Sequence, residues 1–138
     1  MPGKILIVDD QAGITKVVSL IAGQAGFETR CVTVSDQATE AFIDFKPDVV
    51  ILDMIMPGKD GIDVLGEILL TGIPTRFILT SGYGDAYLRL AKGVADFHDA
   101  GVVRVMQKPF RREALADLLR EVTAGLAGVP ASAEACGG

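Results

Sequence analysis

Short apolar runs alternate with helix-length segments along most of this chain, and no other feature restricts its possible folds as strongly. Each run places apolar residues at consecutive positions, which is typical of a strand buried on both faces. Between the runs, apolar residues recur at the spacing of one helix face, as Ile14, Val17, Val18 and Ile21 do. The expected strands are residues 4–8, 27–34, 49–52, 76–80 and 102–106, and the expected helical stripes are residues 14–21, 38–45, 62–69, 87–94 and 115–122.

Strands that are separated by helix-length crossovers pair in parallel, and their helices cover both faces of the sheet. Right-handed crossovers then favour the flavodoxin-like strand order 2-1-3-4-5. The sequence therefore predicts an α/β fold, with a five-stranded parallel sheet in a single doubly wound (βα)5 domain over residues 1–123. Residues 124–138 are rich in Ala and Gly, lack a period and are expected to form a disordered tail.

Composition excludes several classes of protein. The formal net charge of −5 argues against direct nucleic-acid binding, which needs a basic surface. The N-terminus lacks a signal-peptide core, and the chain has no apolar run long enough to span a bilayer, so a cytoplasmic protein without membrane contact is expected. Cys31 and Cys136 suggest no disulfide or metal site; Cys31 is expected to be a small core residue.

Polar residues follow four of the five expected strands. Because ligands bind beyond the carboxyl ends of parallel strands, these residues are expected to meet at one edge of the sheet. They are Asp9 and Asp10 after the first strand, Asp53 after the third, Thr80-Ser81-Gly82 at the fourth and Lys108-Pro109 after the fifth. The second strand instead leads to Ser35-Asp36, where either residue would serve as an N-cap of the following helix.

This set of side chains predicts phosphate chemistry. Three carboxylates without a His or Cys favour Mg²⁺, which binds through a few carboxylates and keeps several waters. A carboxylate can also be a nucleophile and form an aspartyl phosphate. Lys108 adds a positive charge, as phosphoryl transfer requires.

The ordered motifs resemble the receiver domain of two-component response regulators. They are Asp9-Asp10, Asp53 followed by MIMPGKDG, Thr80-Ser81-Gly82 and Lys108-Pro109-Phe110, and the resemblance runs from about residue 4 to residue 122. It implies that a histidine kinase or phosphotransfer protein gives phosphate to Asp53, and that the domain catalyses its own phosphorylation and slow dephosphorylation rather than acting as an enzyme on other molecules. Thr80 and Lys108 would contact the phosphoryl group.

The resemblance also implies a metal site and a switch. Asp10 and Asp53 would bind Mg²⁺ directly, Asp9 largely through water, and the backbone carbonyl of Ile55 would be a further ligand. The switch residues would be Thr80, Ser81, Val105 and Pro109. They would alter the surface formed by the expected helix at residues 87–94, the strand at 102–106 and the helix at 115–122. This surface would bind a downstream protein or a second receiver. Lys108-Pro109 should be a cis peptide with helix 5 starting at Phe110.

Two departures from the family pattern affect switching and lifetime. Receivers usually carry an aromatic residue where this chain has Val105, and the segment between Thr80 and Lys108 is longer than usual. Ile55 and Gly82 offer no polar side chain to hold a hydrolytic water, which predicts a long-lived phosphorylated state. His98 is expected to be a surface residue.

Three other functions fit parts of the pattern. A phosphatase of the haloacid-dehalogenase type would need DxDxT after the first strand, where the chain has Asp9-Asp10-Gln11. A nucleotide- or flavin-binding module would need a phosphate-binding glycine motif. A degenerate receiver would act as a phosphate-independent interaction module. Whether the receiver works alone or within a longer regulator stays open.

Overall fold

The five strands form one parallel sheet in the order β2-β1-β3-β4-β5, which confirms the predicted fold. The structure is a computed structural model, and it describes residues 3–82, 89, 92–93, 96 and 103–124. The strands are β1 Lys4–Val8, β2 Glu28–Val32, β3 Val49–Asp53, β4 Arg76–Ser81 and β5 Val103–Gln107. The helices are α1 Ala12–Gln24, the 3-10 turn η1 Ser35–Gln37, α2 Ala38–Phe45, α3 Gly61–Leu70 and α5 Arg112–Thr123.

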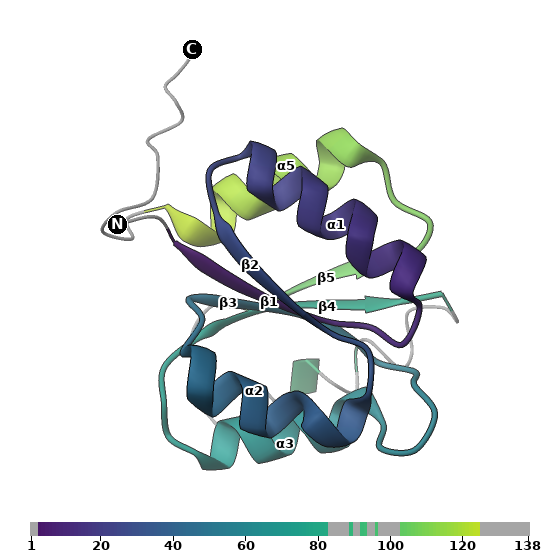
Figure 1. Ribbon diagram of the computed structural model, residues 1–138, viewed down its shortest axis with the longest axis vertical. Coiled ribbons are helices and arrows are strands. Elements are labelled where there is room, and N and C mark those ends of the chain that lie inside the picture. Colours follow the sequence, from purple (N-terminus) through teal and green to yellow (C-terminus); the bar gives the residue numbers. More distant parts are fainter. Residues whose placement is uncertain (1–2, 83–88, 90–91, 94–95, 97–102, 125–138) are drawn as a thin grey trace.

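Two apolar cores lie on opposite faces of the sheet. Helices α1 and α5 cover one face and α2 and α3 cover the other (Figure 1). Alternate residues of one strand enter different cores, so that Leu52 packs with α2 and α3 while Ile51 packs with α1 and α5. This double burial explains why the central strands are apolar at almost every position.

Element ends differ from the predictions at the sheet edge and at α5. Strand β2 is shorter than residues 27–34, and Cys31 is exposed rather than buried in the core. The edge position of β2 leaves one side of this strand open, so its apolar pattern overstates its burial. Helix α5 begins at Arg112, because Arg111 has extended backbone angles and Phe110 packs against the α1 and α5 core instead.

The predicted N-cap at Ser35 or Asp36 is wrong. These residues form η1, and the cap position of α2 is Gln37, which makes no side-chain capping hydrogen bond. The Ser35 hydroxyl instead contacts the loop between β3 and α3. A sequence pattern cannot distinguish a local cap from a bond to a distant loop, because both use a small polar residue before a helix.

Some predictions fall on residues that the structure does not describe. Arg89, Lys92, Gly93 and Asp96 are helical, in agreement with the helical stripe predicted there. His98, the rest of residues 83–102 and the tail from residue 125, with Cys136, lie outside the described residues. Among the described residues, none of the helices has both the length and the apolar character needed to cross a membrane.

Candidate functional site

Three carboxylates meet at the carboxyl edge of the sheet, as the sequence predicted. Strands β1 and β3 are neighbours with Val8 opposite Leu52, so the residues that follow lie side by side. One carboxylate oxygen from each of Asp9, Asp10 and Asp53 lies within 4.8 Å of the others. Asp9 is only 3% exposed and Asp53 only 5%. Two buried carboxylates and the more exposed Asp10 at this spacing fit a hard divalent cation such as Mg²⁺, which prefers oxygen ligands.

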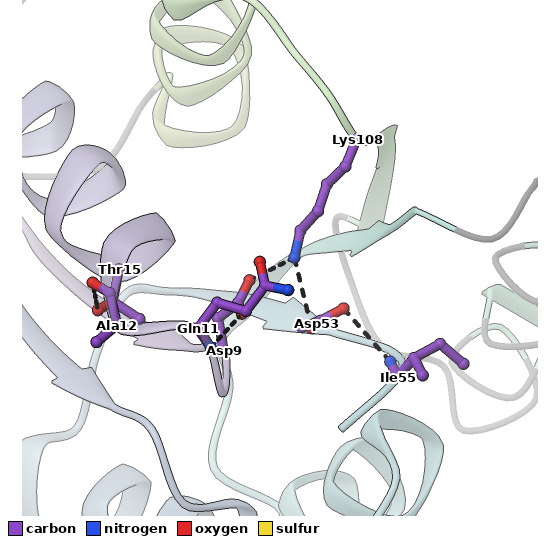
Figure 2. Close-up of polar contacts among 7 residues, drawn as sticks. All are labelled: Asp9, Gln11, Ala12, Thr15, Asp53, Ile55 and Lys108. Atoms are coloured by element: carbon purple, nitrogen blue, oxygen red, sulfur yellow. Dashed lines mark hydrogen bonds and ion pairs between the residues drawn. The ribbon is translucent and has the colours of Figure 1, made fainter. Parts of the chain in front are cut away.

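Lys108 reaches between two of these carboxylates from the end of β5. Its Nζ donates to Asp9 Oδ2 at 2.6 Å and lies 3.4 Å from Asp53 Oδ2, as Figure 2 shows. Its backbone N–H donates to the Ser81 carbonyl at 2.9 Å, which ties the end of β5 to the end of β4. The peptide between Lys108 and Pro109 is cis, as predicted. Lys108 thus supplies a fixed positive charge beside Asp53.

The Asp53 carboxyl group has a perturbed acidity. Burial and then the negative charge of Asp9 raise its pKa to about 6, while Lys108 and the backbone N–H of Ile55 oppose the shift. The dominant cause is loss of hydration, which disfavours the charged form. A cation bound by the carboxylates would oppose both the burial and the repulsion.

Thr80 and Ser81 lie at the end of β4, beside Asp53. Asp53 is opposite Thr80 in the β3–β4 register, and the N–H of Met54 donates to the Thr80 carbonyl at 2.9 Å. Both Thr80 and Ser81 are buried. The hydroxyl-bearing strand end is therefore adjacent to the carboxylate, as the sequence predicted.

The loop between β3 and α3 starts immediately after Asp53, next to the carboxylate cluster. The N–H of Ile55 donates to Asp53 Oδ1 at 3.3 Å (Figure 2). Gly58 has a φ of 79°, a left-handed backbone conformation that glycine adopts without a Cβ clash. A Cβ on Gly61 would lie 2.3 Å from the Asp53 carbonyl oxygen, so only glycine allows α3 to start this close to the end of β3. The sequence pattern did not reveal this close approach.

An open cavity of about 670 Å³ exposes the cluster to solvent. Its lining residues are Asp10, Gln11, Asp53, Ile55, Met56, Pro57, Gly82 and Lys108. The sequence did not identify Gln11, whose backbone N–H donates to Asp9 Oδ1 at 3.0 Å and so orients that carboxylate. A phosphate-sized group can therefore approach Asp53 from solvent.

None of the four predicted switch residues is among the described residues that line this cavity, and Thr80 and Ser81 are buried beside Asp53. Val105 is 43% exposed on β5, opposite Leu79, and is not among the described residues that line the cavity. Pro109 lines an adjoining cavity of about 440 Å³ between α1 and the β5–α5 connection. The structure therefore brings together Asp9, Asp10, Asp53, Ile55, Thr80, Ser81 and Lys108, and leaves Val105 on the surface.

Comparison with known proteins agrees with this geometry. Residues 5–120 match the model of the family described as response regulator receiver domain. Sporulation initiation phosphotransferase F of Bacillus subtilis is 30% identical over 121 residues, which cover 88% of this chain and 94% of that protein. The DNA-binding response regulator MtrA of Mycobacterium tuberculosis H37Rv is 30% identical over 87% of this chain, which spans only 50% of that relative.

Solved structures share the fold. The chemotaxis protein CheY4 of Vibrio cholerae superimposes with a TM-score of 0.78 at 22% identity, covering 88% of this chain and 99% of that one. NtrX of Brucella abortus superimposes with a TM-score of 0.77 at 29% identity, covering 88% of this chain and 27% of that one. The family match covers most of the chain and spans both the acidic cluster and Lys108. This chain therefore belongs to the response regulator receiver domain family of two-component signalling.

Proposed function

We propose that Asp53 is the phosphoacceptor of this receiver and that the acidic cluster binds the Mg²⁺ that the transfer requires. The observation that carries the proposal is the position of the Asp53 carboxylate. It lies at a strand end, on an open cavity, within reach of two further carboxylates and of Lys108 Nζ. Asp53 is thus a nucleophile held on a rigid element and still accessible to a phosphodonor.

In the proposed step, a carboxylate oxygen of Asp53 attacks the phosphorus of a phosphohistidine. The new O–P bond forms as the N–P bond breaks, and the leaving imidazole nitrogen keeps the electron pair and takes up a proton. Lys108 and the Thr80 hydroxyl would contact the oxygens of the transferred group. When bound by Asp9, Asp10, Asp53 and the Ile55 carbonyl, Mg²⁺ supplies positive charge that offsets the repulsion between donor and cluster.

The partners follow from this chemistry. The donor would be a sensor histidine kinase or a phosphotransfer protein, and the transfer would take place in the cytoplasm. The product would act through a changed protein surface formed by the helix predicted around residues 87–94, β5 and α5, toward a downstream protein or a second receiver. The same site would catalyse slow loss of the phosphate.

Intact-mass measurement with acetyl phosphate and Mg²⁺ tests the proposal. The parent protein should gain the mass of one phosphoryl group, stable in acid and removed by hydroxylamine. Asp53→Ala should gain none, whereas Asp63→Ala, a matched change at an exposed carboxylate on α3, should behave as the parent. Absence of the adduct in the parent would support a phosphate-independent interaction module, and an adduct in Asp53→Ala would refute the assignment.

A further inference from the structure

Ser35 holds the loop that forms one wall of the acidic cavity. Its side chain belongs to η1, the turn between β2 and α2, and the residue is only 4% exposed. The hydroxyl donates to the Pro57 carbonyl at 3.1 Å and accepts from the Lys59 N–H at 3.0 Å. One hydroxyl therefore joins the two residues that flank Gly58, using both its donor and its acceptor capacity.

This bond pair holds the turn at Gly58. Gly58 has a φ of 79°, and a Cβ at this glycine would lie 3.6 Å from the Ser35 oxygen. The beginning and end of the loop are anchored separately, since Met54 N–H donates to Thr80 and Gly61 N–H to Met54. Ser35 anchors the part of the loop between these two points.

A second set of contacts connects the same two segments. Lys59 Nζ lies 2.7 Å from Glu67 Oε2 on α3. Thr39, one helical turn beyond Ser35, donates from its hydroxyl to the other Glu67 oxygen at 2.5 Å. Lys59 is thus held through its backbone by Ser35 and through its side chain by Glu67. The segment that begins α2 and the β3–α3 loop form one connected unit.

We propose that Ser35 is a positioning residue for the metal and phosphoryl site. By holding the turn at residues 57–59, its hydroxyl keeps the preceding residue pair, Ile55 and Met56, along the cavity wall. The Ile55 N–H then stays on Asp53 Oδ1, and the Ile55 carbonyl stays available as a metal ligand. Ser35 itself does not line the cavity among the described residues and touches no reacting atom. This role rests on the proposed function of the acidic cluster.

A purely structural role would affect folding and leave cation binding unchanged. Partners that orient metal ligands behave differently, because their mutation lowers metal affinity by about 10–100-fold. Ser19 provides the matched control. Its hydroxyl bonds the Thr29 hydroxyl at 2.8 Å, which links α1 to β2, and it does not line the cavity in the described part of the chain.

Isothermal titration with MgCl₂ tests the proposal on the purified full chain of the parent, Ser35→Ala and Ser19→Ala. We expect the Mg²⁺ dissociation constant to rise about tenfold in Ser35→Ala and to stay at the parent value in Ser19→Ala. Amide exchange without metal should show faster exchange at Lys59 in Ser35→Ala alone. Thermal unfolding measures how much stability each variant loses. The changes in Mg²⁺ affinity and in Lys59 exchange are then compared with that loss.

The outcomes separate this role from the function of the site. Parental Mg²⁺ affinity in Ser35→Ala, or an equal loss in Ser19→Ala, would overturn the proposal for Ser35 while Asp53 remains the phosphoacceptor. Failure of the parent to bind Mg²⁺ would overturn the proposed function instead. If Ser35→Ala does not fold, amide exchange of the parent protein tests the contact instead. Fast exchange of the Lys59 amide in the parent would refute the anchoring contact.

Discussion

Asp53 is a carboxylate in a place where it is poorly hydrated, and this position affects stability as well as reactivity. Its pKa is raised to about 6, chiefly by burial and then by Asp9. The folded state therefore holds a proton on Asp53 at pH values where the unfolded chain has released it. The stability gained from that proton is complete below about pH 4 and is lost as the pH rises through about 6. At neutral pH without metal, the charge on Asp53 opposes folding.

Asp53→Asn should therefore stabilise the metal-free protein at pH 7.5, by about 1–3 kcal/mol in the free energy of unfolding. The amide keeps the shape of the carboxyl group and removes the buried charge. Near pH 4 the gain should shrink, because Asp53 is then largely protonated in the folded parent. Urea unfolding in EDTA at both pH values measures the difference, with Asp63→Asn on the exposed face of α3 as the control. An equal gain at both pH values would contradict this account.

Ile55 and Gly82 both line the cavity, and we expect them to affect the access of water to a phosphoryl group on Asp53. Neither offers a polar side chain to orient a water in line with the bond that breaks. The space beside Gly82 is open, since an added Cβ would first meet the Lys108 Cβ at 3.9 Å. Replacing Ile55 with Asn and Gly82 with Glu should speed decay of the acyl phosphate, roughly tenfold, by positioning that water.

Decay is followed by intact mass after the phosphodonor is removed. Each single variant serves as a control for the pair. A lifetime equal to that of the parent would show that the rate is set elsewhere.

The candidate site residues could be predicted because they lie at or just after the expected strands. Asp9 and Asp53 each end an apolar run, Lys108 follows β5 directly after Gln107, and a parallel sheet brings such ends together. The supporting residues could not be identified in this way. Ser35 bonds to a turn that is distant in the sequence. Gly61 is required because its backbone lies against that of Asp53, and this close approach depends on how α3 packs.

At the level of elements, the connection from β3 to α3 depends on how closely the two can approach. Gly61 starts α3 against the Asp53 carbonyl oxygen and the Met54 Cα, which a Cβ would meet at 2.3 and 2.5 Å. Its N–H also donates to the Met54 carbonyl at 3.0 Å. Any side chain here pushes the helix away from the strand that carries Asp53.

Gly61→Ala should therefore destabilise the protein by about 1–3 kcal/mol, since the clash is with backbone that cannot yield easily. Gly66 provides a matched control in the same helix, because a Cβ there meets nothing within 4 Å. Gly66→Ala should be neutral or stabilising by about 0.5–1 kcal/mol, as expected for glycine in a helix interior. Urea unfolding compares the two variants, and equal effects would argue against the close-approach explanation.

Element types could be predicted from hydrophobic period, whereas element ends could not. The β2 prediction extended beyond Glu28–Val32 at both ends because nearby apolar residues continue the strand pattern. The family resemblance placed the start of α5 at Phe110, but Arg111 has extended backbone angles and the helix begins at Arg112. In β2 the pattern also misplaced Cys31, which is exposed at the sheet edge.

The whole molecule is asymmetric about its site. Thr80 belongs to β4 and Lys108 directly follows β5, on one side of the sheet, while β2 forms the opposite edge. The alternation of strands and helices was sufficient to predict this arrangement, because a parallel sheet with right-handed crossovers admits few strand orders. The output of the site depends on a partner protein. This chain spans about half of the MtrA relative, so its partner is proposed from the chemistry of the site.

Phosphorylation should act on the β4–β5 side and leave the β2 edge unchanged. A phosphoryl group on Asp53 would draw Lys108 Nζ from Asp9 and attract the Thr80 hydroxyl. The two strand ends would move together, because the Lys108 N–H is bonded to the Ser81 carbonyl and Thr80 is opposite Met106. Val105 cannot transmit this motion by rotating inward, since a β-branched side chain is short and stiff at χ1. The displacement should therefore pass to residues 83–110 as a block.

Amide exchange with and without beryllofluoride and Mg²⁺ measures this response. We expect altered exchange in peptides from residues 83–110 and unchanged exchange in β2, Glu28–Val32, which lies at the far edge of the sheet. Asp53→Asn, which lacks the carboxylate expected to bind beryllofluoride, should show unaltered exchange in both regions. The β2 comparison decides between two mechanisms. Equal changes at both edges would indicate that ligand binding stabilises the whole fold by mass action, and no change in 83–110 would exclude this surface as the output of the site.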